Sequence, residues 1–191
     1  MDNSRVWLVI GASGGLGAAA TKYLVSKKQI VIALIIDDSA LGQFYDHEPE
    51  NLHAINVEVF NIITIKETLE NITAKYGWID FIINNSNYQF FIRLKYKEHS
   101  QIKEDIFLSI SATIEMIKTL FPYLNKEPMG RIINIPPELC LATLPDGSNA
   151  ELLTLSMDLF LQNLHDELLN LDCKLSFLKP GERLPEDLDW R

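Results

Sequence analysis

The 191-residue sequence has few residues that build disulfides or metal sites. It contains two cysteines, Cys140 and Cys173, which lie in separate apolar segments with no CxxC pattern and no histidine cluster beside them. This arrangement favours two buried free thiols over a disulfide or a metal-ligand set. We therefore expect no metal centre.

Long apolar runs and an excess of positive charge are also absent. No stretch approaches the roughly 20 consecutive apolar residues of a membrane-spanning helix. The chain carries 17 Lys and Arg against 26 Asp and Glu, a formal net charge of −9. It therefore lacks the cationic surface that binds nucleic acid or anionic lipid without sequence specificity. No charged leader precedes the first apolar run, so we expect a cytoplasmic protein that binds neither nucleic acid nor membranes.

Apolar runs of strand length alternate with longer segments of helical periodicity. Runs rich in Val, Ile and Leu are typical of strands buried on both faces of a parallel sheet that helices cover. The pattern predicts an α/β fold, a single Rossmann-type doubly wound domain over residues 1–182 with about six parallel strands, followed by an irregular tail over 183–191. The expected strands lie within 6–10, 30–36, 53–59, 79–84, 131–135 and 174–179, and the expected helices within 18–27, 65–76, 101–124 and 149–170.

A glycine-rich loop, "GASGGLG", follows the first expected strand directly. Gly11 would make the tight turn after the strand, while Gly15 and Gly17 would let the backbone approach a pyrophosphate and let the next helix pack closely on the sheet. Ser13 adds a hydroxyl, and Gly14 imposes no side chain. The loop lies between a strand and a helix, which favours phosphate binding over a mere tight crossing.

The Gly-x-x-x-Gly-x-Gly spacing resembles that of the short-chain dehydrogenase/reductase family. Further landmarks follow in the family's order over residues 5–182. "IINNSN" is similar to its Asn-Asn-Ala-Gly element, "GRIINI" to its fifth strand and "LKPGE" to the Pro-Gly turn after its sixth, while "VEV" takes the place of its Asp-Val pair. The resemblance implies a nicotinamide cofactor and hydride transfer to or from a carbonyl or alcohol carbon.

The same resemblance implies that the family's catalytic residues are replaced. Its Ser, Tyr, Lys and Asn positions fall on Pro137, Ala150, Thr154 and Ser109. A phenol with its ordinary pKa near 10 is a poor proton donor at neutral pH without a neighbouring cation, so this chemistry needs the Tyr and the Lys together. No tyrosine occurs after Tyr123, so no small shift of alignment restores the pair.

Two other groups are candidates for a substitute acid or base. Glu138 follows the replaced serine position and Tyr88 follows the "NNSN" element, near the expected nicotinamide end. The stretch Tyr23 to Lys27 also matches Tyr-x-x-x-Lys, but it falls in the last turns of the first expected helix, away from the glycine loop. We therefore expect Tyr23 and Lys27 to be core or surface residues.

The resemblance predicts NAD rather than NADP as the cofactor. Asp37, near the end of the second expected strand, is placed to bind the adenosine ribose, or alternatively to cap a loop. Asn84 lies along the cofactor path of the family or caps a strand end. Asn87 stands where the family has glycine and would project a side chain toward the cofactor, so binding is expected to be weak or lost. The expected cofactor-binding residues are Gly11, Ser13, Gly14, Gly15, Leu16, Gly17, Asp37, Glu58, Val59, Asn84, Asn85, Pro180 and Gly181.

The helical segment 149–170 has leucines around more than one face. A single buried stripe needs fewer apolar residues, so the excess predicts a partner, although packing on a neighbouring helix is the alternative. By the family resemblance, segments 101–124 and 149–170 form a homodimer interface. The leading interpretation is a catalytically impaired NAD(P)-binding or regulatory protein, and the alternative is an active oxidoreductase with a non-standard acid or base.

Overall fold

The computed structural model describes residues 4–35, 49–56, 62–85, 115–125, 130–135 and 174–177. Six strands form one sheet in the order β3-β2-β1-β4-β5-β6, and every neighbouring pair is parallel. The strands are β1 (Val6–Ile10), β2 (Ile30–Ile35), β3 (Leu52–Asn56), β4 (Phe81–Asn84), β5 (Arg131–Asn134) and β6 (Lys174–Phe177). This order is that of a doubly wound Rossmann sheet, which confirms the predicted fold class.

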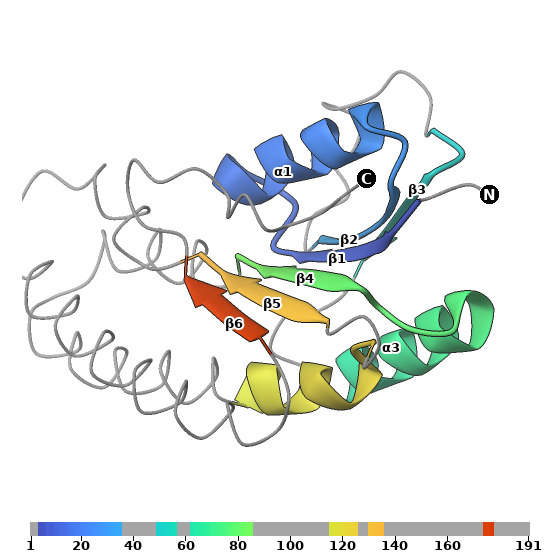
Figure 1. Cartoon of the computed structure of the whole chain (residues 1–191), viewed down its shortest axis with the longest axis vertical. Helices are drawn as coiled ribbons and strands as arrows, with labels where there is room; N and C mark the ends of the chain where they lie inside the picture. The colour runs from blue at the N-terminus through green and yellow to red at the C-terminus, as the bar shows by residue number, and fades with distance from the viewer. Residues whose placement is uncertain are drawn as a thin grey trace, which may run out of the picture.

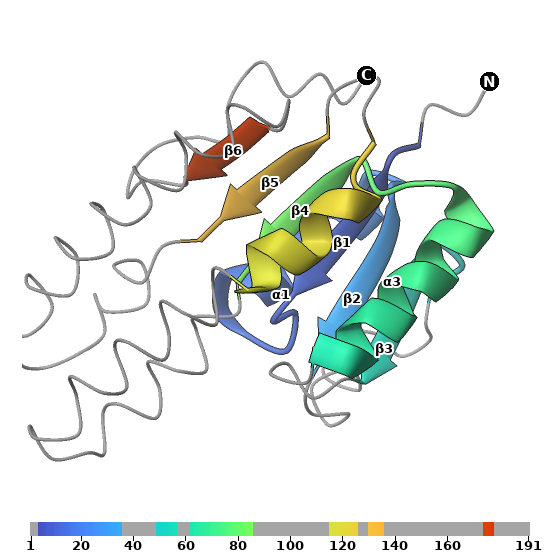
Figure 2. The same ribbon diagram turned by 90° about the horizontal axis from the view of Figure 1, so that it is seen from below.

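Helices cover both faces of the sheet. Helix α1 (Gly15–Ser26) lies on one face, whereas α3 (Ile62–Tyr76) and the helical residues 115–120 lie on the other (Figure 1). Figure 2 shows α3 and segment 115–120 side by side across β1, β2 and β4. The central strands are therefore buried from both sides, as their unbroken runs of Val, Ile and Leu predict.

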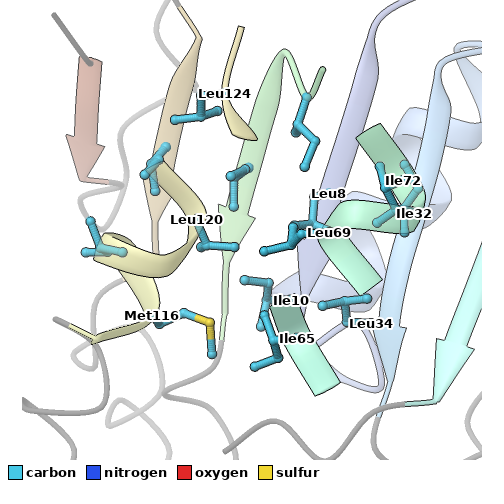
Figure 3. Close-up of a cluster of buried hydrophobic side chains, with 14 of the residues drawn as sticks. Leu8, Ile10, Ile32, Leu34, Ile65, Leu69, Ile72, Met116, Leu120 and Leu124 are labelled. Carbon is cyan, nitrogen blue, oxygen red and sulfur yellow. The ribbon is translucent and has the colours of Figure 1, made fainter. Parts of the chain in front are cut away.

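The two faces of the sheet carry separate apolar clusters because side chains alternate along each strand. Leu8 and Ile10 of β1 pack with α3 and segment 115–120, and Figure 3 shows Ile65, Leu69, Met116 and Leu120 converging on them. Trp7 and Val9 face α1 instead. The Trp7 ring stacks on Phe81 of β4 with its centroid 4.2 Å away. Both clusters fix the strands and thereby the loops that follow them.

The predicted helix 101–124 ends earlier than expected, so the prediction of its C-terminal end was wrong. Regular helix stops at Leu120, and a 3-10 turn, η1 (Phe121–Tyr123), carries Pro122 near its start. Proline has no N–H and its ring crowds the preceding turn, so an α-helix does not continue through it undisturbed. Leu124 is extended and forms an isolated parallel bridge with Ile79, which precedes β4. A long-range pairing has replaced the last helical turn.

A buried carboxylate ties the amino end of the sheet together. Asp80 Oδ2 accepts a hydrogen bond of 2.9 Å from the Val6 N–H, and Asp80 Oδ1 accepts one of 3.1 Å from Asn125 Nδ2. Arg5 Nη1 lies 3.6 Å from Oδ1. One side chain therefore links β1, β4 and the segment that follows η1.

Candidate functional site

The glycine loop connects β1 to α1 at the carboxyl edge of the sheet. Its base is buried and its tip is open: Gly11, Ala12 and Gly17 are buried, whereas Gly15 and Leu16 are exposed. The Ala12 N–H donates to the Leu34 carbonyl at 3.1 Å, which anchors the loop to β2. The loop follows the central strand, with β2 on one side and β4 on the other. In a doubly wound sheet, ligands bind at this switch point.

A positive φ angle explains why two positions of the loop are occupied by glycine. Gly11 has φ +71° and Gly15 has φ +56°, both in the left-handed region that residues with a Cβ rarely adopt. Gly17 is required for a different reason. A Cβ on Gly17 would lie 2.3 Å from the Gly11 carbonyl oxygen and 2.7 Å from Asn85 Nδ2. The motif spacing is therefore a packing requirement of this loop.

Asn85, which directly follows β4, is hydrogen-bonded to the glycine loop. Its Nδ2 donates to the Gly11 carbonyl at 3.0 Å and to the Gly14 carbonyl at 3.4 Å, and its own N–H donates to the Ile10 carbonyl at 3.0 Å. The side chain is 1% exposed. Its Oδ1 has no hydrogen-bond partner among the described residues. Asn85 thus fixes the orientation of the two loop carbonyls.

The first turn of α1 is left open to a ligand. Gly14 is its N-cap in extended backbone, without a side-chain cap, and the first turn contains no acidic residue. The first N–H groups of a helix have no intrahelical partner, and the helix dipole places partial positive charge there. These features together suit a phosphate group, since an anion would accept the N–H bonds that no side chain takes.

Asn84 is held within the sheet. It is fully buried, and its Nδ2 donates to Asn134 Oδ1 at 2.8 Å across the β4–β5 pair. Asn134 Nδ2 is buried without a partner among the described residues. The sequence interpretation gave no role to Asn134. The available signal was register, because "IIN" ends both β4 and β5 and the two asparagines face each other.

The Tyr-x-x-x-Lys stretch in α1 lies on the surface. Tyr23 is 48% exposed, and Lys27 Nζ lies 5.5 Å from the centre of its ring, at the end of α1 away from the glycine loop. Within the described ranges, no helix has the length and apolar character that a membrane crossing requires. In the same part of the chain, no group of three or more His, Cys, Asp or Glu is placed to hold a metal ion.

The remaining predicted positions lie outside the described residues. They are the replaced catalytic positions Ser109, Pro137, Ala150 and Thr154, the substitutes Tyr88 and Glu138, the cofactor residues Asp37, Glu58, Val59, Pro180 and Gly181, Asn87, both cysteines and the helical segment 149–170. The structure therefore brings together the glycine loop, Asn84 and Asn85 from the predicted set.

Comparison with protein families matches residues 5–149 to the short chain dehydrogenase model. Among curated proteins, the 3-oxoacyl-[acyl-carrier-protein] reductase FabG of Vibrio cholerae is 30% identical over 134 residues, which cover 69% of this chain and 54% of that protein. The Escherichia coli reductase of the same name is 25% identical over 182 residues, covering 93% of this chain and 72% of that one. The first of these alignments thus spans about half the relative's length.

Solved structures show the same fold. A short-chain dehydrogenase from Streptomyces avermitilis superposes with a TM-score of 0.70 at 20% identity, covering 97% of this chain and 68% of its own. A metagenomic short-chain oxidoreductase in complex with NADP gives a TM-score of 0.66 at 19% identity, covering 94% and 82%. The matched family model extends over most of the chain and includes the glycine loop, Asn84 and Asn85. The chain therefore belongs to the short-chain dehydrogenase family.

Proposed function

We propose that this protein binds a nicotinamide dinucleotide, preferentially NAD, at the glycine loop, and that it acts as a binding or regulatory protein without the hydride-transfer activity of its family. The observation that supports dinucleotide binding is the structure of the glycine loop. Its tip is exposed, the α1 N-terminus has no side-chain cap, and Asn85 fixes the carbonyls beneath it.

The residues present fit the cofactor's pyrophosphate. Gly17 leaves the close approach between the loop and Asn85 free of a Cβ, and the N-terminal amides of α1 are the donors for the phosphate oxygens. Asp37 is the proposed ribose ligand and the reason for preferring NAD. When bound, the nicotinamide ring supplies or accepts a hydride. Two of the similar structures hold NADP, so the choice of cofactor is part of the test.

The sequence supports the loss of catalysis. Pro137 has no hydroxyl to hold a substrate oxygen, Ala150 has no proton to give, and Thr154 has no charge to lower a neighbouring pKa. The proposed phosphate contacts at the glycine loop come from backbone N–H groups and not from these three side chains. Binding without turnover is therefore the combination that this sequence favours.

An active oxidoreductase is the alternative, because the two similar curated proteins described above are reductases. In that case Glu138 or Tyr88 supplies the proton. Glu138→Gln and Tyr88→Phe separate the two proposals, since an enzyme that relies on either group loses turnover when that group is replaced and keeps cofactor binding.

The first experiment is calorimetric titration of the protein with NADH and, separately, NADPH, followed by an assay for NADH oxidation with a 3-oxoacyl thioester. We expect micromolar to millimolar binding that is tighter for NADH, and no oxidation above the rate without protein. Absence of binding to both nucleotides at millimolar concentration contradicts the proposal that the protein binds a nicotinamide dinucleotide. Oxidation of NADH contradicts the proposal that it acts without hydride-transfer activity.

We also propose that the chain forms a homodimer through segments 101–124 and 149–170. The support is the excess of leucine in the second segment, beyond what one buried stripe requires. Light scattering coupled to gel filtration gives the test: a mass of twice 21.8 kDa is expected, and a monomer at all micromolar concentrations contradicts the proposal.

A further inference from the structure

A cavity lies at the amino edge of the sheet, at the end opposite the glycine loop. It has a volume of about 690 Å³ and lies between the end of α3 and residues 122–125, which include the end of η1. Volumes of roughly 300–1,000 Å³ are typical of sites for small organic ligands. Among the described residues, neither the glycine loop nor Asn84 and Asn85 contribute to it.

The first wall of this amino-edge cavity consists of Thr73, Gly77 and Trp78. Gly77 ends α3 with φ +89°, and its N–H donates to the Thr73 carbonyl at 2.8 Å. A Cβ on Gly77 would meet no atom within 4 Å. Trp78 follows at once and is 58% exposed. The glycine turn therefore ends the helix and leaves a large aromatic side chain at the mouth of the cavity.

The second wall is residues 122–125, which comprise the last two residues of η1 and the two residues after it. It is fixed to the first wall by backbone bonds: the Ile79 N–H donates to the Tyr123 carbonyl at 3.0 Å, and the Asn125 N–H donates to the Ile79 carbonyl at 2.8 Å. Asn125 Nδ2 is bound to Asp80 at 3.1 Å. The two walls share a hydrogen-bonded seam, so the cavity is preformed and a ligand need not order it.

The chemistry of the lining defines the ligand class. Among the residues that the structure describes, no Asp, Glu, Lys, Arg or His lines the cavity, so these residues offer a charged ligand no counter-ion for the hydration it would lose. The hydroxyl of Thr73 donates to the Leu69 carbonyl at 2.9 Å and the amide of Asn125 is engaged by Asp80, which leaves recognition to the aromatic residues. Trp78 and Tyr123 are the aromatic residues of this lining, and they carry an indole N–H and a hydroxyl.

We propose that the amino-edge cavity binds an uncharged planar aromatic molecule that carries a hydrogen-bonding oxygen, with Trp78 and Tyr123 as the recognition residues. A flat ring gains stacking against both side chains, and its oxygen accepts from one of their polar hydrogens. The finite volume favours a small molecule over an extended peptide. Binding here is independent of the nucleotide, because the glycine loop lies at the other edge of the sheet.

The test is calorimetric titration of the full chain with 2-naphthol, which is planar and uncharged at pH 7. Two matched probes accompany it: naphthalene-2-sulfonate has the same rings with a fixed charge, and decahydro-2-naphthol has the same outline without aromatic faces. We expect 2-naphthol to bind at least about tenfold more tightly than either, since loss of stacking on one aromatic side chain weakens binding by roughly that factor or more.

Substitutions inside and outside the cavity test whether 2-naphthol binds there. Trp78→Ala is expected to weaken 2-naphthol binding at least about tenfold. The exposure of Trp78 means that folding does not depend on it, which circular dichroism checks. Tyr123→Phe keeps the ring and is expected to weaken binding by a smaller factor of about threefold or more, the loss of one hydrogen bond. Tyr23→Ala removes a comparably exposed aromatic from α1, outside the cavity, and is expected to change nothing.

Four outcomes overturn the proposal. They are equal binding to wild type and Trp78→Ala, binding of the sulfonate as tight as that of 2-naphthol, displacement of 2-naphthol by NADH, and binding of a proline-rich peptide through Trp78 while 2-naphthol fails to bind. Only the displacement outcome involves NADH, and the other three can be scored whether or not NADH binds, so this proposal and the proposed function fail separately.

Discussion

At the scale of single residues, Gly17 sets the tightest constraint in the glycine loop. A Cβ there would come within 2.3 Å of a backbone oxygen, which a rotamer change does not relieve. We predict that Gly17→Ala destabilises the protein by about 3 kcal/mol, the upper part of the range for overpacked sites. Urea unfolding followed by circular dichroism measures it.

The matched control is Ala19→Ser in the same helix. Ala19 is exposed, so this change is expected to alter stability by no more than about 0.5 kcal/mol. If both variants unfold at the same urea concentration, the loop moves freely enough to accept the extra carbon. The close approach to Asn85 is then not a constraint.

Asn85 gives a second prediction, which depends on pH. Asn85→Asp places a carboxylate against the Gly11 and Gly14 carbonyls, where the amide now donates at 3.0 and 3.4 Å. Only the protonated acid donates, so the folded state should raise the pKa of the new carboxyl above the unfolded value near 3.9. The stability lost by the variant is therefore smallest below about pH 4 and grows as the pH rises.

The measurement is the difference in unfolding free energy between wild type and Asn85→Asp at pH 4.5 and pH 7. We expect a deficit of about 2 kcal/mol at pH 7 that shrinks at pH 4.5. Asn85→Ala, which has no titratable group, should show a deficit that does not vary with pH. An equal deficit for Asn85→Asp at both pH values would mean that the side chain does not face the carbonyls in solution.

At the scale of elements, Asp80 joins three segments by hydrogen bonds more than by its ion pair. Arg5 lies 3.6 Å away with 28% of its side chain exposed, so solvent screens the attraction. The bonds from Val6 and Asn125 are shorter and buried. We predict that Asp80→Asn costs about 2 kcal/mol of unfolding free energy, because its amide group must face another donor, whereas Arg5→Ala costs less than about 1 kcal/mol.

Urea unfolding of the two variants and the double variant decides between these contributions. An Arg5→Ala deficit as large as that of Asp80→Asn would show that the ion pair dominates. The same experiment reports on the amino-edge cavity, because Asn125 forms part of its wall. Asp80→Asn should therefore also loosen that wall.

The sequence predicted those structural elements that are determined by residues close together in the chain. The Val, Ile and Leu runs located all six strands to within a few residues, and the glycine spacing located the loop between β1 and α1. The end of the helix at Leu120 was missed although Pro122 is a local signal for it, and the pairing of Leu124 with Ile79 could not be predicted because these residues lie 45 positions apart. Two further features were missed because they also need long-range pairing: the Asn84–Asn134 bond requires the parallel register of β4 and β5, and the amino-edge cavity requires the bridge between Ile79 and Leu124.

At the scale of the whole molecule, the parallel sheet separates two ends with different chemistry. The carboxyl edge carries the uncapped N-terminus of α1 and suits an anion. The amino edge carries the hydrogen bonds of Asp80 and a cavity whose described lining residues include two aromatic and no charged side chains. The strands between them are buried on both faces and packed by two apolar clusters. A ligand at either edge therefore stabilises the same cooperative unit.

This coupling makes cofactor binding measurable as thermal stability. A ligand at 100 times its Kd adds about 2.7 kcal/mol to the unfolding free energy. A chain of this size changes its Tm by about 2–4 °C per kcal/mol, so saturating NADH should raise the Tm by about 5–10 °C. Gly15→Val should abolish the shift, because valine is strained at φ +56° and distorts the loop that receives the phosphates.

Tyr23→Ala is the control for this experiment, since Tyr23 lies on the same helix but at its far end, and it should keep the full shift. A shift of equal size in Gly15→Val would place NADH elsewhere than the glycine loop. If 2-naphthol and NADH are both bound, their shifts should add, because the two sites share no residue and stabilise the sheet from opposite edges. A combined shift no larger than the greater single one would mean that the two ligands compete for one site.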